Sequence, residues 1–326
     1  MSQKTFNDPT LDGKDTDIVI PIMGATGAGK STFINYILGE DRMEVGHHLT
    51  SCTEVLAPTV VIPQKLPRNL KDHRVVIVDT PGFDDTHAED VEILRRIATW
   101  LEKSYRKQMV LGGVIYLHDI SQDRFTGTAR RNLTMFNHLC GDASLKKVIL
   151  VTTKWEKFHH IQHAERRETE LKEIHWKYMM EHGTEVCRFM TRQSREEGRK
   201  SAWEIIDATL RRVSGEKKES RKKTGLQIQK ELVEHYKMIP QTEAGKQLHY
   251  SLQEFLKMQK QMADLEADIA KSGEDPEAMA KLQEMEETIR KLQDQIQSLK
   301  VSLPQRIRRW IRKIVRDPQT SYSSHS

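Results

Sequence analysis

The stretch "GATGAGKS", residues 24–31, decides the fold of this chain. It fits the pattern GxxxxGK[ST] and follows directly on the β-branched run "DIVIPIM" (17–23). An amphipathic stretch, Ser31–Leu38, comes next and ends at Gly39. A strand, a glycine-rich loop and a helix in this order are the context that confirms a P-loop. The sequence therefore predicts a phosphate-binding loop in an α/β fold, rather than a glycine-rich turn that merely precedes a helix.

The expected chemistry of this loop follows from its residue types. Glycines let backbone N–H groups turn inward around phosphates, and the following helix adds its positive N-terminal end. Lys30 is expected to reach the β- and γ-phosphates as the catalytic cation, and Ser31 to offer its hydroxyl to Mg²⁺. The predicted nucleotide-binding residues of the loop are Gly24, Ala25, Thr26, Gly27, Ala28, Gly29, Lys30, Ser31 and Thr32.

A second motif, "RVVIVDTPGFDD" (74–85), places an aspartate at the end of a buried strand. Asp79 can hold Mg²⁺ through water, and the amide of Gly82 can sense the γ-phosphate because glycine leaves room for close backbone approach. The pattern DxxG alone is a common turn, but after a P-loop it is a strong indication. We therefore add Asp79 and Gly82 to the predicted nucleotide site.

Between these motifs, "GHHLTSCTEVL" (46–56) stands where a first switch loop is needed. Thr50 and Thr53 are candidates for the second hydroxyl on Mg²⁺, and Thr53 is preferred because a strand starts right after it. The alternative is that Thr53 only begins that strand, where β-branched residues are common. The expected metal ligands are Ser31, Thr53 and Asp79, and the expected catalytic residues are Lys30 and Thr53.

Apolar strands alternate with amphipathic helices up to residue 213. Several runs are continuously apolar, as strands covered on both faces must be. This alternation predicts a doubly wound α/β sheet in one domain over residues 17–213. The further strands are expected in "VLAPTVVIP", "HRVVIVD", "GGVIYLHDI", "KKVILVTT" and "EVCRFM", and the further helices over Asp90–Lys107, Ala129–Leu139, His163–Met180 and Ser201–Val213.

Beyond residue 213 the composition changes. "SGEKKESRKKTG" (214–225) predicts a charged linker, and residues 226–303 predict an α-helical, coiled-coil extension. The break "SGEDP" (272–276) leaves two arrangements open, an antiparallel pair of helices or two segments that pair with another chain. The heptad seam of the second helix consists of Leu282, Met285, Ile289, Leu292, Ile296, Leu299 and Leu303.

The C-terminal part carries a basic amphipathic helix over residues 304–316. In "RIRRWIRKIVR" (306–316) apolar residues recur at helical spacing, and basic residues fill the other positions. Such a helix lies on an anionic membrane surface or docks into a partner groove, and the plainer alternative is a packed terminal helix with a solvated basic face. Residues 317–326 are expected to form a disordered tail.

Composition narrows the class of protein. The net charge of +5 over 326 residues is too mild to indicate a nucleic-acid partner, so none is expected. The three cysteines are widely spaced and lack metal-binding spacing, which favours a reducing compartment. No secretory signal and no run of about 18 apolar residues is found. We expect a cytoplasmic protein that reaches a membrane only peripherally.

Three quoted motifs, "GATGAGKSTFIN", "DTPGFDDT" and "VILVTTKWEK" (148–157), together resemble the septin-like branch of P-loop GTPases. The chain is similar to the immunity-associated (avirulence-induced) GTPases and to G-domain proteins abundant in mushroom-forming fungi. "GGVIYLHDISQDRFTGTARRNL" (112–133) and "SAWEIID" (201–207) also resemble the fungal members. The resemblance implies a Ras-like sheet with one antiparallel strand, GTP or GDP with Mg²⁺, slow hydrolysis, and homodimerisation through the switch face.

The resemblance also implies a guanine site at the end of "VILVTTKWEK". In that family a Thr-Lys-x-Asp pattern ends the strand, and its carboxylate accepts hydrogen bonds from N1–H and the exocyclic amine of guanine. Thr153, Lys154 and Glu156 occupy the pattern here, with a glutamate one methylene longer than aspartate. Adenine lacks the N1–H donor, so such a site rejects ATP. The segment "RFMT" (188–191) falls where the family contacts the base with backbone.

Two departures keep alternatives open. Phe83 stands where Ras-type enzymes place a water-orienting glutamine, so fast unaided hydrolysis is not expected and a partner would supply the missing group. Phe83 and Glu156 favour an alternative, a nucleotide-binding scaffold with weak catalysis that acts through its helical extension. An ATP-driven activity is a third hypothesis, and Glu156 could also be only a solvated charge at a strand end.

Overall fold

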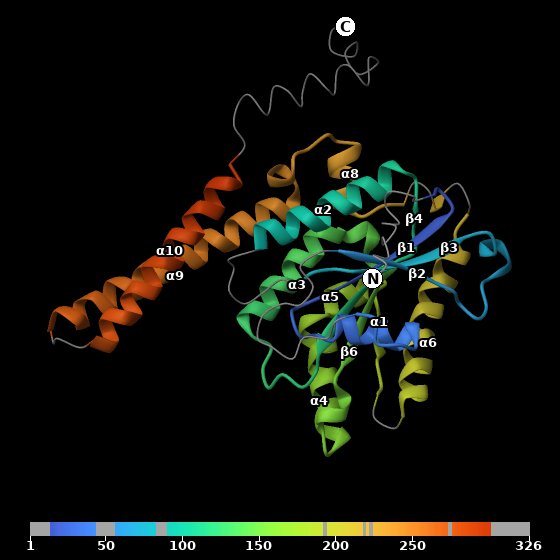
Figure 1. The fold of residues 1–326 in the computed structure, drawn as a ribbon, viewed down its shortest axis with the longest axis horizontal. Helices are drawn as coiled ribbons and strands as arrows, with labels where there is room; N and C mark the ends of the chain where they lie inside the picture. The colour runs from blue at the N-terminus through green and yellow to red at the C-terminus, as the bar shows by residue number, and fades with distance from the viewer. Residues whose placement is uncertain are drawn as a thin grey trace, which may run out of the picture.

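A central sheet with helices on both faces forms the body of the protein (Figure 1). The computed structural model describes residues 14–43, 56–82, 90–191, 194–217, 220–221, 224–272 and 276–300. Within these residues the sheet has seven strands, in the order β2-β3-β1-β5-β6-β7, with β4 paired to β1. The strands are β1 (Asp17–Gly24), β2 (Ala57–Val61), β3 (Arg74–Asp79), β4 (Val110–Leu111), β5 (Val114–Asp119), β6 (Val148–Thr153) and β7 (Glu185–Arg188).

The doubly wound sheet predicted from the alternating pattern is confirmed. All described strand pairs are parallel except β2 with β3, which is the one antiparallel pair that the resemblance implied. The strand expected to begin at Gly112 is β5, which begins at Val114, and the short strand β4 just before it was not expected. The carboxyl ends of β1, β3, β5 and β6 therefore lie at one edge of the sheet, where a ligand site is expected in such folds.

Alternate side chains of the strands enter two different cores. Val19 and Val76 pack with the helices on one face, whereas Ile18 and Ile77 pack with α1 and α6 on the other. Both faces of the sheet are buried, so its strands must be apolar almost throughout. The helices of the domain are α1 (Lys30–Leu38), α2 (Asp90–Arg106), α3 (Gly127–Cys140), α4 (Ile161–Glu170), α5 (Lys177–Glu181) and α6 (Arg195–Ser214).

Two helices differ from the expectation more than the others, whose ends shift by one or two residues. The helix expected over His163–Met180 is α4, a π-helical turn (Leu171–His175) and α5 in succession. Helix α6 begins at Arg195, six residues before the expected start, because the side chain of Ser194 accepts a hydrogen bond from Glu197 N and caps it. Capping by a serine outside the apolar pattern extends the helix beyond the residues that bury against the sheet.

The C-terminal helices begin as part of the same body. They are α8 (Gln227–Val233), α9 (Glu243–Ser272) and α10 (Pro276–Ser298). Ile228 and Leu248 are buried in the core that contains α2 and α3. The side chain of Gln229 donates hydrogen bonds to Leu101 O (3.0 Å) and Ser104 Oγ (3.2 Å) on α2. Helix α8 and the start of α9 thus complete the helical layer on this face.

The segment predicted to be a charged linker (214–225) includes a buried residue, Arg221. This arginine is only 5% exposed and donates hydrogen bonds to Ser214 O (3.1 Å), Glu216 O (3.0 Å) and Asn69 O (3.3 Å). A run of charged residues predicts exposure to solvent. Here, however, the guanidinium group of Arg221 donates hydrogen bonds to backbone carbonyl groups inside the fold. The division of the chain into domains stays a prediction.

Helices α9 and α10 lie side by side and project from the body as an arm (Figure 1). Leu292, Ile296 and Leu299 of the predicted seam are buried, whereas Met258 and Met279 on the arm are more than half exposed. Within this chain the helices fold back on each other, which is the antiparallel arrangement. Coiled-coil pairing between chains stays a prediction, and residues 304–326 lie outside the described residues.

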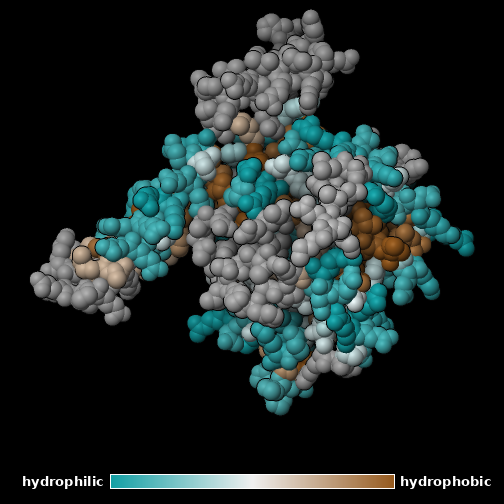
Figure 2. Space-filling model, viewed as in Figure 1, coloured by the Kyte–Doolittle hydropathy of each residue, from teal (hydrophilic) through white to brown (hydrophobic). Residues whose placement is uncertain are grey.

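The surface is mostly hydrophilic on the side seen in Figure 2. An apolar area lies over the edge strand β2, where Val60 is 40% exposed and Ile62, just beyond its end, is 87% exposed. Among the described residues, no helix is long and apolar enough to cross a membrane.

The packing predicts that α8 contributes to the stability of the sheet domain. Ile228→Ala removes a fully buried side chain, so the free energy of unfolding should fall by about 2–5 kcal/mol. Urea unfolding followed by tryptophan fluorescence measures it, because Trp155 and Trp176 are fully buried in the sheet domain. The matched control is Ile174→Ala, at a residue 65% exposed, which should change stability by less than about 0.5 kcal/mol. An unfolding transition of the Ile228→Ala variant that coincides with the parent's would show that α8 is only an appendage.

Candidate functional site

The P-loop closes around its own lysine. It runs from the end of β1 into α1, and Gly29 has φ 92°, a left-handed conformation that glycine adopts without steric cost. Lys30 is 7% exposed, and its ammonium group donates hydrogen bonds to Gly24 O (3.1 Å) and Ala25 O (3.0 Å). The expected phosphate-binding cation is thus placed inside the loop, while Ser31 and Thr32 form the first turn of α1.

Burial changes the acidity of this lysine. Desolvation lowers the pKa of Lys30 to about 8, although the nearby carboxylate of Asp79 acts in the opposite direction. A buried ammonium group loses the solvation that favours its charged form. An anionic ligand in the loop would restore that preference, so the pocket is electrostatically suited to phosphate.

The two described metal-ligand candidates are in direct contact. Ser31 Oγ donates a hydrogen bond of 2.9 Å to Asp79 Oδ2, although the residues are 48 positions apart in the sequence. The parallel register of β1 and β3 sets Asp79 beside Ile22, two residues before the P-loop. Thr80 Oγ1 then donates to Ile22 O (2.8 Å) and fixes the chain that follows the strand. The structure therefore brings together the hydroxyl and the carboxylate that the sequence predicted.

Gly82 lies against the P-loop as the DxxG motif predicted. A Cβ added at this glycine would come within 2.8 Å of Lys30 Nζ and closer still to Thr26 N. Real Cβ atoms do not approach other atoms so closely, so only glycine fits here without a shift of the loop. The backbone of Gly82 can consequently meet a ligand held by Lys30.

The expected base-reading residues lie at the other end of the same edge. Thr153 Oγ1 donates to Ala28 O (2.9 Å) and ties the end of β6 to the P-loop. Lys154 has a left-handed φ of 63°, and its ammonium group forms an ion pair of 2.7 Å with Asp119. The exposed Glu156 accepts a hydrogen bond from Thr191 Oγ1 at 2.9 Å. Of the predicted pattern, Thr153 thus contacts the P-loop directly, whereas Lys154 and Glu156 pair with Asp119 and Thr191.

Asp119 is a site residue that sequence reasoning missed. It ends β5 and lies directly beside Thr153 in the parallel register of β5 and β6. Burial alone would raise the pKa of Asp119, but hydrogen bonds from Lys154 and Ser121 bring it below its ordinary value. The signal was present in "GGVIYLHDI", where a carboxylate ends an apolar strand as Asp79 does. Asp119 fixes the Lys154 stem that is expected to pack along the base.

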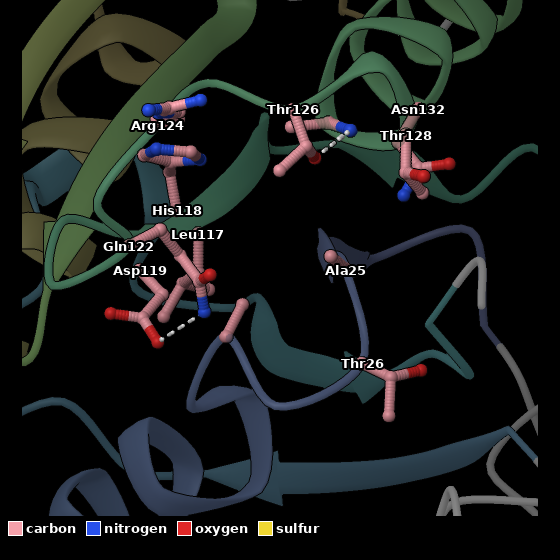
Figure 3. Close-up of a pocket in the computed structure, with 12 residues that line it drawn as sticks. Ala25, Thr26, Leu117, His118, Asp119, Gln122, Arg124, Thr126, Thr128 and Asn132 are labelled. Atoms are coloured by element: carbon pink, nitrogen blue, oxygen red, sulfur yellow. Dashed lines mark hydrogen bonds between the residues drawn. The ribbon is translucent and has the colours of Figure 1, made fainter. Parts of the chain in front are cut away.

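A cavity of about 130 Å³ opens between the P-loop and the start of α3 (Figure 3). Figure 3 shows Ala25 of the P-loop across from Thr126 and Thr128 of the β5–α3 segment, whereas the side chain of Thr26 points away from them. Burial lowers the pKa of His118 to about 4, so this imidazole is neutral at physiological pH. The lining residues are Ala25, Thr26, Ala28, Leu117, His118, Asp119, Gln122, Arg124, Thr126, Thr128, Ala129 and Asn132. Sequence reasoning identified none of the β5–α3 residues, and apart from Asp119 nothing local marks them as neighbours of the P-loop.

Several predicted site residues lie outside the described residues. They are Thr50 and Thr53 of the expected first switch loop and Phe83 after the DxxG motif. The described geometry consequently includes Ser31 and Asp79 of the predicted metal ligands, and Lys30 of the predicted catalytic residues.

Comparison with known proteins agrees with this geometry. The model of the AIG1 family matches residues 18–223, which is more than half of the chain. The chain belongs to the AIG1 family. It is a P-loop GTPase domain of this type, followed by the helices described above. The family match does not distinguish the septin-like branch or the fungal members within this class.

Two curated relatives are GTP-binding or GTPase proteins by name. GTP-binding protein A of Dictyostelium discoideum is 26% identical over 143 residues, which are 44% of this chain and 29% of that protein. The tRNA modification GTPase MnmE of Chlorobium luteolum is 29% identical over 133 residues, 41% of this chain and 24% of that protein. The chain thus spans about a quarter of the length of the curated relatives it matches.

Two solved structures are similar to this chain at low identity. Toc33 from Arabidopsis thaliana, in complex with Mg²⁺ and GMPPNP, has a TM-score of 0.46 and 15% identity, over 60% of this chain and 83% of that one. Era from Aquifex aeolicus, bound to GDP and AlF₄⁻, has a TM-score of 0.41 and 17% identity, over 60% of this chain and 56% of that one.

The lowered pKa of Lys30 predicts a pH dependence of nucleotide binding. Phosphates stabilise the ammonium form, so the pKa of Lys30 is higher in the complex than the value of about 8 in the free protein. Below pH 8 the lysine is charged in both states and no proton is taken up. Above pH 8 binding must take up a proton, so affinity should fall by up to about tenfold per pH unit.

Calorimetry of GDP binding in two buffers of different ionisation enthalpy measures this proton uptake at pH 7 and pH 9. The matched control is Lys30→Arg, since guanidinium stays charged at both pH values. Uptake at pH 9 in the parent but not in Lys30→Arg is the expected result. The same uptake in both proteins would assign it to another group.

Proposed function

We propose that this chain binds GTP and GDP with Mg²⁺, hydrolyses GTP slowly, and dimerises through the face that carries its P-loop and switch segments. The observation that carries the proposal is the contact of Ser31 Oγ with Asp79 Oδ2 at 2.9 Å, beside the buried ammonium group of Lys30. Membership of the AIG1 family supports the nucleotide class. The septin-like branch and the fungal likeness belong to this proposal as well.

The residues present fit Mg²⁺ and a nucleoside triphosphate. Mg²⁺ prefers hard oxygen ligands and binds through one or two carboxylates together with phosphates. Ser31 and Asp79 offer a hydroxyl and a carboxylate at one point, and Thr53 stays the predicted third ligand. When bound there, the ion neutralises charge on the β- and γ-phosphates. Lys30, released from the carbonyls of Gly24 and Ala25, would donate to the same phosphates.

The proposed preference for guanine depends on the other end of the site. The carboxylate of Glu156 would accept hydrogen bonds from the N1–H and amine of guanine, while the stem of Lys154 would pack along the base. Adenine offers no N1–H, so a carboxylate at this place would lose its donor. Thr153, held to Ala28 O, sets the distance between this end and the phosphates.

Slow hydrolysis and dimerisation rest on the sequence. Phe83 cannot orient the attacking water as glutamine does, so one chain alone lacks a catalytic group. A second copy docked on the same face would supply it. We infer that the hydrolytic site is complete only in the dimer, which makes the rate dependent on protein concentration.

The hydrolysis prediction concerns the rate of phosphate release per molecule. With GTP and Mg²⁺ this rate should be low in dilute protein and should rise as the concentration of the chain increases. Lys30→Ala should abolish release, because the phosphates lose their cation, whereas the matched control Lys200→Ala on the exposed side of α6 should retain it. Competition of unlabelled ATP against GTP tests the nucleotide class in the same preparation.

Each part of the proposal has its own contradicting outcome. A rate per molecule that stays flat from dilute to concentrated protein argues against completion by a second copy. Tight GTP binding without any release that depends on Lys30 supports the alternative of a nucleotide-binding scaffold. Equal competition by ATP and GTP contradicts the guanine preference.

We also propose that residues 306–316 attach the chain peripherally to an anionic membrane on the cytoplasmic side. The proposal rests on the sequence pattern of "RIRRWIRKIVR", in which basic residues surround an apolar stripe. Each basic side chain near an anionic surface contributes about 1 kcal/mol, and salt screens this attraction.

Sedimentation with vesicles measures this attachment. The full chain should bind vesicles that contain phosphatidylserine at low salt and should detach as salt rises. A variant with Arg308, Arg309 and Arg312 changed to glutamine should bind clearly less at equal salt. Equal binding to neutral and anionic vesicles, or no binding by the parent, contradicts the proposal.

A further inference from the structure

We propose that Thr191 is a specificity-determining residue, which holds the carboxylate of Glu156 in position to read guanine. The inference rests on the proposed function and names a residue whose side chain no motif indicated. Sequence reasoning expected only backbone contacts to the base from residues 188–191. The structure shows instead that the Thr191 hydroxyl donates a hydrogen bond of 2.9 Å to Glu156 Oε2.

A glutamate at this position poses a physical problem. Its stem has one more rotatable bond than that of aspartate, and Glu156 is exposed. An unrestrained exposed carboxylate would sample several rotamers, and fixing it on the base would cost conformational entropy. A partner that fixes the carboxylate before the base arrives removes part of this cost.

The backbone that carries Glu156 is fixed from below. Glu156 lies in a single 3-10 turn, Trp155–Lys157, that follows directly on β6. Trp155 is fully buried, and its indole N–H donates to the Oγ1 (3.0 Å) and the carbonyl (3.2 Å) of Thr152. Lys157 N closes the turn on Lys154 O at 3.2 Å. The backbone at Glu156 therefore has little freedom, and only the side chain of Glu156 remains to be oriented.

The segment that carries Thr191 is fixed as well. Phe189 N donates to Thr152 O (2.9 Å), which extends the pairing beyond the end of β7. Met190 N donates to Ser201 Oγ (3.0 Å) on α6. The ring of Phe189 packs edge-on against Phe33 of α1 at a centroid distance of 5.1 Å. Thr191 follows these three anchors directly, so its hydroxyl is placed by rigid elements.

An ion pair between the partly exposed Arg188 and the buried Glu168 supports both segments. The guanidinium group of Arg188 lies 4.4 Å from the centre of the Trp155 ring and binds both carboxylate oxygens of Glu168, at 2.7–3.1 Å. Glu168 is 2% exposed and also accepts from Lys172 and Thr152. Stacking and bidentate pairing fix the guanidinium plane. The contact of Arg188 with Trp155 thus connects the Glu156 turn to the segment that leads to Thr191.

The hydrogen bond leaves the carboxylate able to bind guanine. Each carboxylate oxygen has two lone pairs, so Oε2 can accept from Thr191 and from one guanine donor together. Oε1 can accept from the other donor. A hydrogen bond between exposed groups contributes little to folding. Its expected effect is therefore on the orientation of the carboxylate, and hence on the choice of base.

The test measures the dissociation constants of GDP and ADP for the parent, Thr191→Val and Thr191→Ser. Valine keeps the shape of threonine and removes the hydroxyl, whereas serine retains a donor. Thr191→Val should weaken GDP by about fivefold, the size of one ordinary hydrogen bond, and leave ADP unchanged. Thr191→Ser should restore most of the GDP affinity. Thermal unfolding midpoints equal to the parent's should show that the fold is intact.

A double-mutant cycle with Glu156→Asp gives the sharper test. The shorter stem of aspartate does not need the threonine, so Thr191→Val should have no effect on GDP in the Glu156→Asp background. The same loss in both backgrounds, no loss in either, or equal losses for GDP and ADP would overturn the inference. A parent that binds GDP no more tightly than ADP would instead refute the guanine preference itself, and the inference would fall with it.

Discussion

The burial of the Lys30 ammonium group in the P-loop is the interaction on which the rest of the site depends. A buried cation needs acceptors at hydrogen-bond distance, and the carbonyls of Gly24 and Ala25 supply them at 3.1 and 3.0 Å. β1 lies between β3 and β5 inside the sheet, and both carbonyls lie where β1 passes into the P-loop. The carboxyl end of β3 then places Asp79 close enough to act on the pKa of the lysine. The sheet thus positions a buried positive charge at which a phosphate group can bind.

The sheet and the phosphate end of the site could be predicted because their signals are local. Each strand is a short apolar run, and both Lys30 and Asp79 stand where such a run ends. Boundaries were less predictable where capping or packing decides them, as at Ser194 before α6 or at the π-helical turn Leu171–His175. An amphipathic pattern of period 3.6 does not distinguish a continuous helix from one with an inserted wide turn.

Other parts of the site could not be predicted because they depend on contacts between distant segments. Asp119 has a local signal at the end of its strand, but its pairing with Lys154 depends on the register of β5 with β6. His118 lines the cavity beside the P-loop, which no local pattern indicates. Arg221 looked like a linker residue because its charged neighbours dominate the local composition. The docking of α8 on α2 requires Gln229 to reach Leu101 O, 128 residues earlier in the chain. No local window of sequence contains both partners of such contacts.

The two ends of the nucleotide site are joined by side chains that bypass any ligand. Thr153 donates to the P-loop carbonyl of Ala28, and Phe189 packs on Phe33, one turn into the helix that begins with Lys30. Close-packed groups transmit a displacement because no free volume absorbs it. A shift of the turn at Trp155–Lys157 must therefore move either the P-loop or the first turn of α1. The longer side chain of Glu156 is compatible with this constraint because Glu156 is exposed and its carboxylate pairs with Thr191, outside the buried contacts of Thr153 and Trp155.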